Sequence, residues 1–212
     1  RASGGPGCGV IGGKPPHMMD EEERKKGLKI DDMFIDVGAI NKEEVANLGI
    51  DVGTPITIDR EFKELANSRV TGKAFDNRAG VAMLIKTLQT VKSPLTIYGV
   101  FTVQEEVGLK GARTSAYTIE PDIAVATDVT IPGDHPGIEM KDAPVEMGKG
   151  PVITIVDSSG RGLIADRRIV KWLKDAADQN SITVQMEVGS GGTTDATAIH
   201  LTKGGIPSTT IS

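Results

Sequence analysis

Residues 72–108, GKAFDNRAGVAMLIKTLQTVKSPLTIYGVFTVQEEVG, decide the fold that this sequence predicts. Apolar side chains recur at three- and four-residue steps over residues 78–91, which is the pattern of an amphipathic helix. Pro94 stops that helix, and the β-branched and aromatic run over residues 95–103 predicts a strand directly after it. A helix followed at once by a strand is typical of an α/β domain.

The same alternation continues toward the end of the chain. We expect short strands at residues 123–126, 152–156 and 183–188, and helices at residues 166–179 and 195–203. Residues 66–212 are therefore predicted to form one α/β domain around a central, at least partly parallel sheet.

The first part of the chain has a different pattern of short strands and turns. Residues 10–65 predict a small β-rich domain, with strands at residues 33–37 and 55–58. Residues 41–49 begin with Asn and end with Gly, which marks a short helix, whereas the mixed charges of residues 20–26 indicate a solvated turn. Residues 1–9 hold four glycines and a proline and are expected to be a flexible tail or joint.

Composition excludes several classes of protein. A net charge of -5 without a basic stripe argues against nucleic acid as a partner. No apolar run reaches the roughly 20 residues of a membrane helix and no signal peptide is visible, so we expect no membrane partner and a cytoplasmic location. The single cysteine, Cys8, cannot form an intrachain disulfide or a thiolate metal site. With only three histidines, any metal site must depend on carboxylate oxygens.

Three acidic segments stand where hydrophobic runs end, and their carboxylates are Asp76, the pair Glu105 and Glu106, and Asp128. Ligands of open α/β sheets bind outside the carboxyl ends of the strands, so these carboxylates are expected to converge on one crevice. Like charges in one pocket raise a pKa unless a cation lies between them. We therefore expect a divalent cation, with one glutamate of the pair as ligand and the other as a base toward water.

Each of these carboxylates also has a simpler interpretation. Asp76 precedes the helix at residues 78–91 and could cap it. Asp128 could form an Asx turn, and Glu105 and Glu106 could be an exposed pair in a loop. All of them lie at strand-to-loop transitions of one domain, which favours the shared site.

Other signals are weaker. The glycine-rich residues 189–195 resemble a phosphate-binding loop but lack the Gly-Lys-Ser/Thr ending, so a turn with Thr194 or Asp195 as helix N-cap is favoured. His17 and His200 are interpreted as structural, and His135 is the one histidine that we consider near a metal.

Four segments together resemble the M42 metallo-aminopeptidases, which include the tetrahedral aminopeptidases of archaea. They are GKAFDNRAG at residues 72–80, TVQEEVGLKGA at 102–112, TDVT at 127–130 and GGTTDA at 191–196. The resemblance extends over residues 10–212. It implies a zinc-exopeptidase-like three-layer α/β/α domain with a mixed central sheet, and a small β-barrel, PDZ-like dimerisation domain. It also implies self-association through the β-rich domain, commonly into dodecamers.

The resemblance also implies roles for individual residues. Asp76 would bridge two divalent metal ions, zinc or cobalt, while Glu106 would bind one of them and Asp128 the other. Glu105 would be the general base, and the substrate would be a peptide with a free amino terminus. Gly192, Thr194 and Asp195 are assigned to substrate binding.

Two histidine ligands of the family have no counterpart here. One belongs to a His-x-Asp motif that precedes the barrel domain, and the other to a Tyr-Ile-His-Ser-like segment beyond residue 212. Each metal would keep one shared and one private carboxylate, and we expect weak metal binding because imidazole favours zinc. A partial or engineered chain is favoured over a variant with replaced ligands.

A metal-dependent aminopeptidase that acts on short peptides is the leading hypothesis for function. An inactive assembly scaffold built from the same fold is the alternative. A glycosidase is less favoured, because its two acids stand across a substrate at about 5 to 9.5 Å, whereas adjacent Glu105 and Glu106 suit metals better.

Overall fold

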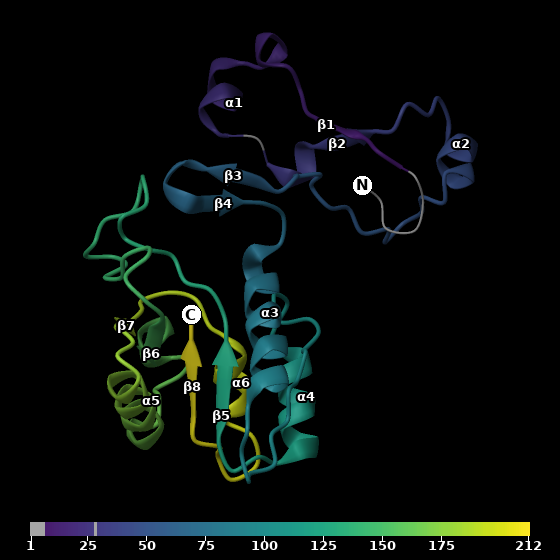
Figure 1. The fold of residues 1–212 in the computed structure, drawn as a ribbon. Coiled ribbons are helices and arrows are strands. Elements are labelled where there is room, and N and C mark those ends of the chain that lie inside the picture. The colour runs from purple at the N-terminus through teal and green to yellow at the C-terminus, as the bar shows by residue number, and fades with distance from the viewer. Residues whose placement is uncertain (1–6, 28) are drawn as a thin grey trace. The chain divides into compact units, whose positions relative to one another are not determined.

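The computed structural model describes residues 7–27 and 29–212, and the chain divides into two compact units between Lys73 and Ala74 (Figure 1). The sequence placed this boundary between residues 65 and 66. The difference arises because β3 (Lys63–Leu65) and β4 (Arg69–Thr71) form an antiparallel hairpin, which keeps both strands in the first unit. Most of the expected tail, residues 1–9, lies outside the described residues.

The first unit contains two separate strand pairs and short helices. One pair is the hairpin of β3 and β4, and the other is β1 (Val10–Gly12) with β2 (Phe34–Asp36), which is also antiparallel. The helical segments are η1 (Pro16–Met18), α1 (Glu21–Lys25), η2 (Ile30–Asp32), α2 (Lys42–Asn47) and η3 (Ala66–Ser68). Helix α2 confirms the helix expected from its Asn cap, since Asn41 Oδ1 accepts from the Glu44 N–H at 2.9 Å.

Two expectations for this unit were wrong. Residues 20–26 hold helix α1 and not a turn, because Asp20 and Glu23 form a capping box in which each side chain accepts from the other's backbone N–H. Residues 55–58 form no strand, and only Ile56 makes a bridge. The described strands of this unit pair only two by two, so the PDZ-like barrel stays a prediction.

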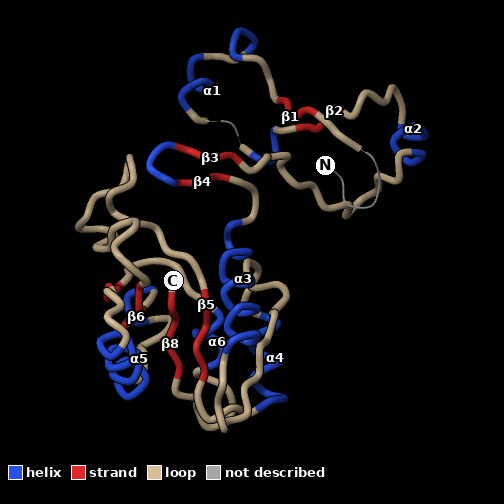
Figure 2. The backbone as a smooth tube through the Cα atoms, viewed as in Figure 1, coloured by secondary structure: helices blue, strands red, loops and turns tan. Residues whose placement is uncertain are grey.

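A four-stranded sheet forms the centre of the second unit, in the order β5 (Ala124–Thr127), β8 (Ser208–Ile211), β6 (Val152–Val156) and β7 (Gln185–Val188). β5 runs parallel to β8 and β6 runs parallel to β7, whereas β6 and β8 are antiparallel. The sheet is therefore mixed, and the predicted α/β class is confirmed (Figure 2).

Helices flank this sheet. They are α3 (Phe75–Thr90), α4 (Lys110–Ile119), α5 (Arg167–Gln179), α6 (Asp195–Ile199) and the short η4 (Ser158–Gly160). Helix α5 contacts β6 and β8, while α3 and α6 contact β5, and α4 packs on α6 (Figure 1). Among the described residues, no helix has both the length and the apolar character needed to cross a membrane.

Residues 95–103 do not form the strand that their composition predicts. Their β-branched and aromatic side chains favour extended backbone, but these residues pair with no other described strand, and a strand exists only through its ladder. The sequence also gave no signal for α4, and it predicted α6 to run to residue 203, whereas the helix ends at Ile199.

Strand β8 is buried although it is polar. Ser208, Thr209 and Thr210 are each at most 1% exposed. Their hydroxyl groups are all hydrogen-bonded: Thr209 donates to the Thr154 carbonyl at 2.8 Å, Thr210 pairs with the Thr194 hydroxyl at 2.6 Å, and Ser208 donates to the Ile206 carbonyl at 2.8 Å. Buried hydroxyls that are satisfied in this way carry little desolvation cost.

Leu163 lies at the centre of the apolar core, with no exposed surface, among Ala126, Ala165 and Ala196. We expect Leu163→Ala to lower the free energy of unfolding by about 2 to 5 kcal/mol, because it removes buried methyl groups and leaves a cavity. Urea denaturation measures this change. The matched control is Leu201→Ala, whose side chain is 73% exposed, and it should cost less than about 0.5 kcal/mol. Equal losses would contradict this description of the core.

Candidate active site

The start of helix α3 places Asp76. The N-cap position is Ala74, which is left-handed with φ 62° and provides no side-chain cap. Asn77 takes that role instead: its Oδ1 accepts from the Gly80 N–H at 2.9 Å, and its Nδ2 donates to the Thr127 carbonyl at 2.7 Å. Asp76 is therefore not the helix cap. The side chain of Asn77, the residue after Asp76, joins the start of α3 to the end of β5.

A tight turn places Glu105 and Glu106 before helix α4. Gln104 has a left-handed φ of 57°, and the Glu105 carbonyl accepts from the Gly108 and Leu109 N–H groups at 3.0 and 2.9 Å. Gly108 itself has φ 118°, which side chains with a Cβ rarely adopt. The backbone thus turns sharply at this pair, as expected, and both carboxylates face the same cavity.

Asp128 follows the last residue of β5. Its N–H donates to the Ile211 carbonyl of the neighbouring β8 at 3.0 Å, and its own Oδ1 accepts from the Val129 N–H at 2.8 Å. This bond reaches the next residue and not the one after it, so it is not the bond of the Asx turn that the simpler interpretation predicted. It occupies one carboxylate oxygen and leaves the side chain in the cavity wall.

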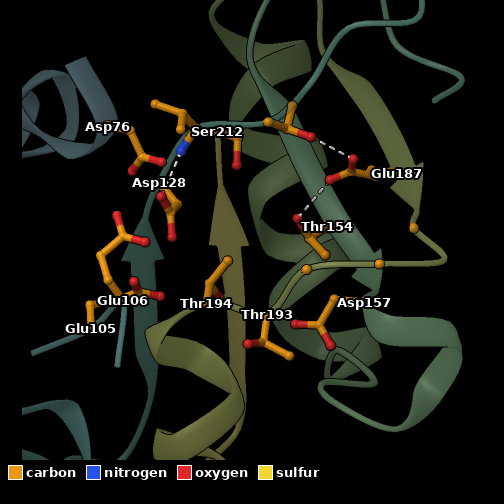
Figure 3. Close-up of a pocket in the computed structure, with 15 residues that line it drawn as sticks. Asp76, Glu105, Glu106, Asp128, Thr154, Asp157, Glu187, Thr193, Thr194 and Ser212 are labelled. Carbon is orange, nitrogen blue, oxygen red and sulfur yellow. Dashed lines mark hydrogen bonds between the residues drawn. The ribbon is translucent and has the colours of Figure 1, made fainter. Parts of the chain in front are cut away.

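These carboxylates line one cavity of about 180 Å³ in the second unit (Figure 3). In the figure Asp76, Glu105, Glu106 and Asp128 gather together, while Asp157 and Glu187 lie across from them. The remaining lining residues are mainly small or hydroxyl-bearing: Val129, Thr130, Thr154, Gly189, Gly191, Gly192, Thr193, Thr194 and Ser212. The structure thus brings the sequence-predicted carboxylates to a single crevice.

Burial, together with like-charge repulsion, raises the pKa values of Glu105 and Asp128. Burial raises the pKa of Glu105 from its ordinary 4.5 to about 7, with repulsion from Asp128, Asp195, Glu106 and Asp76 adding to the effect. Burial also raises the pKa of Asp128 to about 6, against the opposing bond from the Val129 N–H. The charged forms of these groups are therefore unfavourable until a proton or another cation offsets them.

The three residues assigned to substrate binding occupy different places. Gly192 and Thr194 line the cavity, whereas Asp195 is the first residue of helix α6 and is not in the lining. Neither Thr194 nor Asp195 caps α6 with its side chain, because Thr194 bonds to Thr210 and Asp195 Oδ2 accepts from the Thr102 hydroxyl at 2.6 Å. Asp195 Oδ1 is buried with no hydrogen-bond partner among the described residues, and burial raises the pKa of this carboxyl.

The donor set matches a divalent cation in its chemistry. Four carboxylates offer hard oxygen ligands on one cavity, two of them have raised pKa values, and a buried Asp195 oxygen nearby lacks a partner. However, no three His, Cys, Asp or Glu side chains among the described residues are grouped closely enough to hold one ion. The described residues therefore fit a cation in charge and donor type but supply an incomplete ligand set.

The histidines and the cysteine lie elsewhere. His17, His135 and His200 are not among the residues that line the cavity, so the suggestion that His135 is near a metal gains no support. His200 Nδ1 lies 3.1 Å from the Ala196 carbonyl, which agrees with a structural role. Cys8 is exposed.

Sequence reasoning missed two acidic residues of the cavity, Asp157 and Glu187. Asp157 directly follows β6, the same strand-to-loop position that singled out the other acids, so this signal was available. Glu187 lies inside strand β7, where a charged residue usually marks a solvated face, and its sequence context gave no signal.

Comparison with known proteins identifies one family. The sequence profile of the M42 glutamyl aminopeptidases matches residues 2–212. The putative aminopeptidase FrvX of Escherichia coli K12 is 39% identical over 200 residues, which cover 94% of this chain and 55% of that protein. The chain thus spans little more than half the length of this relative.

Solved structures show the same similarity. A tetrahedral (TET) aminopeptidase from the marine sediment archaeon Thaumarchaeota archaeon SCGC AB-539-E09 superposes with a TM-score of 0.88 at 41% identity, covering 96% of this chain and 58% of that chain. The TET1 peptidase of Pyrococcus horikoshii, described as assembling into a tetrahedron or a large octahedral shell, has a TM-score of 0.69 at 32% identity. That match covers 96% of this chain and 58% of the TET1 chain.

The raised pKa of Glu105 predicts how the stability of the folded protein depends on pH in the absence of metal. The folded state keeps the Glu105 proton up to about pH 7, whereas the unfolded chain releases it near 4.5, so the folded state loses stability as pH rises between these values. Asp128 contributes with the same sign, from 3.8 to about 6. We expect the melting temperature of chelator-treated protein to fall over this range, and Glu105→Gln to flatten the fall.

Calorimetric melting curves between about pH 4.5 and 8 measure this dependence. Glu139→Gln, at a surface glutamate whose side chain is 70% exposed, should keep the wild-type slope. If Glu105→Gln and wild type decline in parallel, the raised pKa of Glu105 is wrong.

Proposed function

This chain belongs to the M42 aminopeptidase family, as its four motifs predicted, and we propose that the polypeptide containing it is a metal-dependent aminopeptidase of short peptides. The observation that carries the proposal is the convergence of Asp76, Glu105, Glu106 and Asp128 on one cavity, with the pKa of Glu105 raised to about 7. The family match supports hydrolysis of an amino-terminal peptide bond, and the cavity supplies the acidic groups for it.

Metal ions are part of this proposal. Asp76 would be shared between two divalent ions, zinc or cobalt, with Glu106 on one and Asp128 on the other, and further ligands would come from outside the described set. When bound, such ions polarise the scissile carbonyl group and acidify water.

Glu105 is proposed as the general base. A pKa near the working pH lets a carboxylate both accept a proton from water and return it to the leaving amine. The turn at Gln104 and Gly108 fixes the backbone of Glu105 at the cavity wall, so the proton is moved by a positioned group.

Self-association is proposed for the first unit. The Pyrococcus horikoshii relative is described as forming a tetrahedron or an octahedral shell, and the sequence resemblance assigns dimerisation to the β-rich domain. We propose that this protein forms homo-oligomers by the same route.

Replacing the proposed base tests the mechanism. We expect Glu105→Gln to lower kcat about 100- to 10,000-fold with a small change in KM, because the amide cannot accept a proton but keeps the shape of the side chain. Hydrolysis of leucyl p-nitroanilide by the metal-loaded protein measures this. The control is Glu139→Gln, which should retain wild-type kcat. Full activity of Glu105→Gln would exclude Glu105 as the base.

Metal content tests the ligand assignment separately from activity. We expect the polypeptide that contains this chain and supplies the further ligands to hold about two zinc or cobalt ions per subunit after dialysis, and its Asp76→Asn variant to hold about one or none, because the variant loses the shared carboxylate. Elemental analysis measures the content. Asp122→Asn, at an exposed aspartate outside the cavity lining, is the control. Unchanged metal content in Asp76→Asn would reject the bridging role.

A further inference from the structure

Glu187 is an acidic residue of the cavity that neither the family motifs nor the proposed mechanism uses. It belongs to β7, and two hydroxyl groups fix its carboxylate: Thr130 Oγ1 donates to Oε1 at 2.6 Å and Thr154 Oγ1 donates to Oε2 at 3.3 Å (Figure 3). Thr154 is only 3% exposed, so this support comes from the core of the sheet. Glu187 is thus a positioned group and not a mobile surface side chain.

Glu187 also keeps free acceptor capacity, and it is less buried than Asp157, the other acid on its side of the cavity. Asp157 is 5% exposed, and its two oxygens accept from the Leu163 N–H and from the Thr197 hydroxyl. A carboxylate offers about four acceptor sites, and the two threonines use two of those on Glu187. Because Asp157 is buried and Glu187 is only half-buried, Glu187 is the carboxylate on this side that is more accessible to a further donor.

The charge of the cavity favours one kind of donor. Among the described residues, every charged side chain that lines it is a carboxylate: Asp76, Glu105, Glu106, Asp128, Asp157 and Glu187. The described part of the chain contributes no Lys, Arg or His to this lining that could receive an acidic side chain of a substrate. The proposed metal ions would offset the charge of Asp76, Glu106 and Asp128, so Asp157 and Glu187 are the lining carboxylates left without a metal or proton-transfer role, and their side of the cavity attracts a cationic group.

The wall beside Glu187 leaves room for a long side chain. Gly189, Gly191 and Gly192 line the cavity without side chains, and a Cβ added at Gly191 or Gly192 would meet nothing within 4 Å. Figure 3 shows Glu187 across the cavity from Glu105, so a residue whose amide bond lies near Glu105 could extend its side chain toward Glu187.

We propose that Glu187 binds the terminal ammonium or guanidinium group of a basic amino-terminal residue, so that the preferred substrates are peptides beginning with Lys or Arg. This inference rests on the proposed aminopeptidase function and names its substrate class. Glu187 determines specificity and takes no part in proton transfer. A charge-assisted hydrogen bond in a partly buried site is strong enough to discriminate a cationic side chain from a neutral one of equal length.

Paired substrates test this role. Lysyl and norleucyl p-nitroanilides differ in the ε-ammonium group, so the ratio of their kcat/KM values isolates its contribution. For the metal-loaded protein containing this chain we expect a ratio above about 10 in favour of lysine, and Glu187→Gln should lower that ratio at least about tenfold. Glu187→Lys should reverse the order of lysyl and glutamyl substrates. Glu139→Gln should leave all ratios unchanged.

Three outcomes would overturn the inference. One is a wild-type ratio near one, and another is a ratio that survives in Glu187→Gln. The third is an equal loss of lysyl and norleucyl hydrolysis in that variant, which would show that Glu187 binds the α-amino group common to all substrates. Melting temperatures of the variants verify that each is folded.

A binding measurement separates this inference from the proposed function. Calorimetric titration with lysinamide and norleucinamide needs no turnover. If no aminoacyl substrate is hydrolysed, the aminopeptidase proposal fails, while tighter binding of lysinamide that Glu187→Gln abolishes still supports Glu187 as the cation-binding group. Equal affinity for the two amides in the wild-type protein rejects it.

Discussion

The burial of several carboxylates at one cavity is the constraint on which the candidate site depends. Three separate segments bring Asp76, Glu105, Glu106 and Asp128 together, and the pKa of Glu105 is raised to about 7, by burial first and by repulsion from its acidic neighbours second. A folded chain keeps such an arrangement only where protons or cations offset the charge. The acidic cavity is therefore better explained as a binding site for positive charge than as a device for stability.

Backbone and amide hydrogen bonds hold these carboxylates where they would not gather on their own. Asn77 joins the start of α3 to the Thr127 carbonyl of β5, and Asp128 pairs through its N–H with Ile211 of β8. None of these bonds uses the carboxylate of Asp76. The fold thus fixes the backbone that carries the acids, and the Val129 N–H occupies one oxygen of Asp128. Groups that are positioned before a ligand arrives are what preorganised catalysis requires.

Sequence reasoning succeeded where one local signal sufficed. The Asn41 cap, the apolar period that predicts α3 and the acids at strand ends all identified their structures, because spacing along the chain encodes each of them. It failed where a partner decides the outcome. Residues 95–103 have the composition of a strand but pair with no described strand. Strand β8 is buried although its threonines are polar, because their hydroxyl groups bond to partners that are distant in sequence. Glu187 escaped notice for the same reason, since the two threonines that fix it are distant in sequence.

The family is described as glutamyl aminopeptidases, a name that refers to an acidic amino-terminal residue. The described cavity wall, however, carries six carboxylates and has no cationic side chain that could bind an acidic residue. The four motifs hold the acids proposed for metal binding and proton transfer, and two of those acids, Glu105 and Glu106, are adjacent in the chain. Glu187 and its support Thr154 lie outside these motifs, on β7 and β6, although its other support, Thr130, belongs to the motif TDVT. The proposed roles in reaction and selectivity thus fall on different segments of the chain. Members of one family can therefore share the hydrolytic centre while the strands beside it set which amino-terminal residue is accepted.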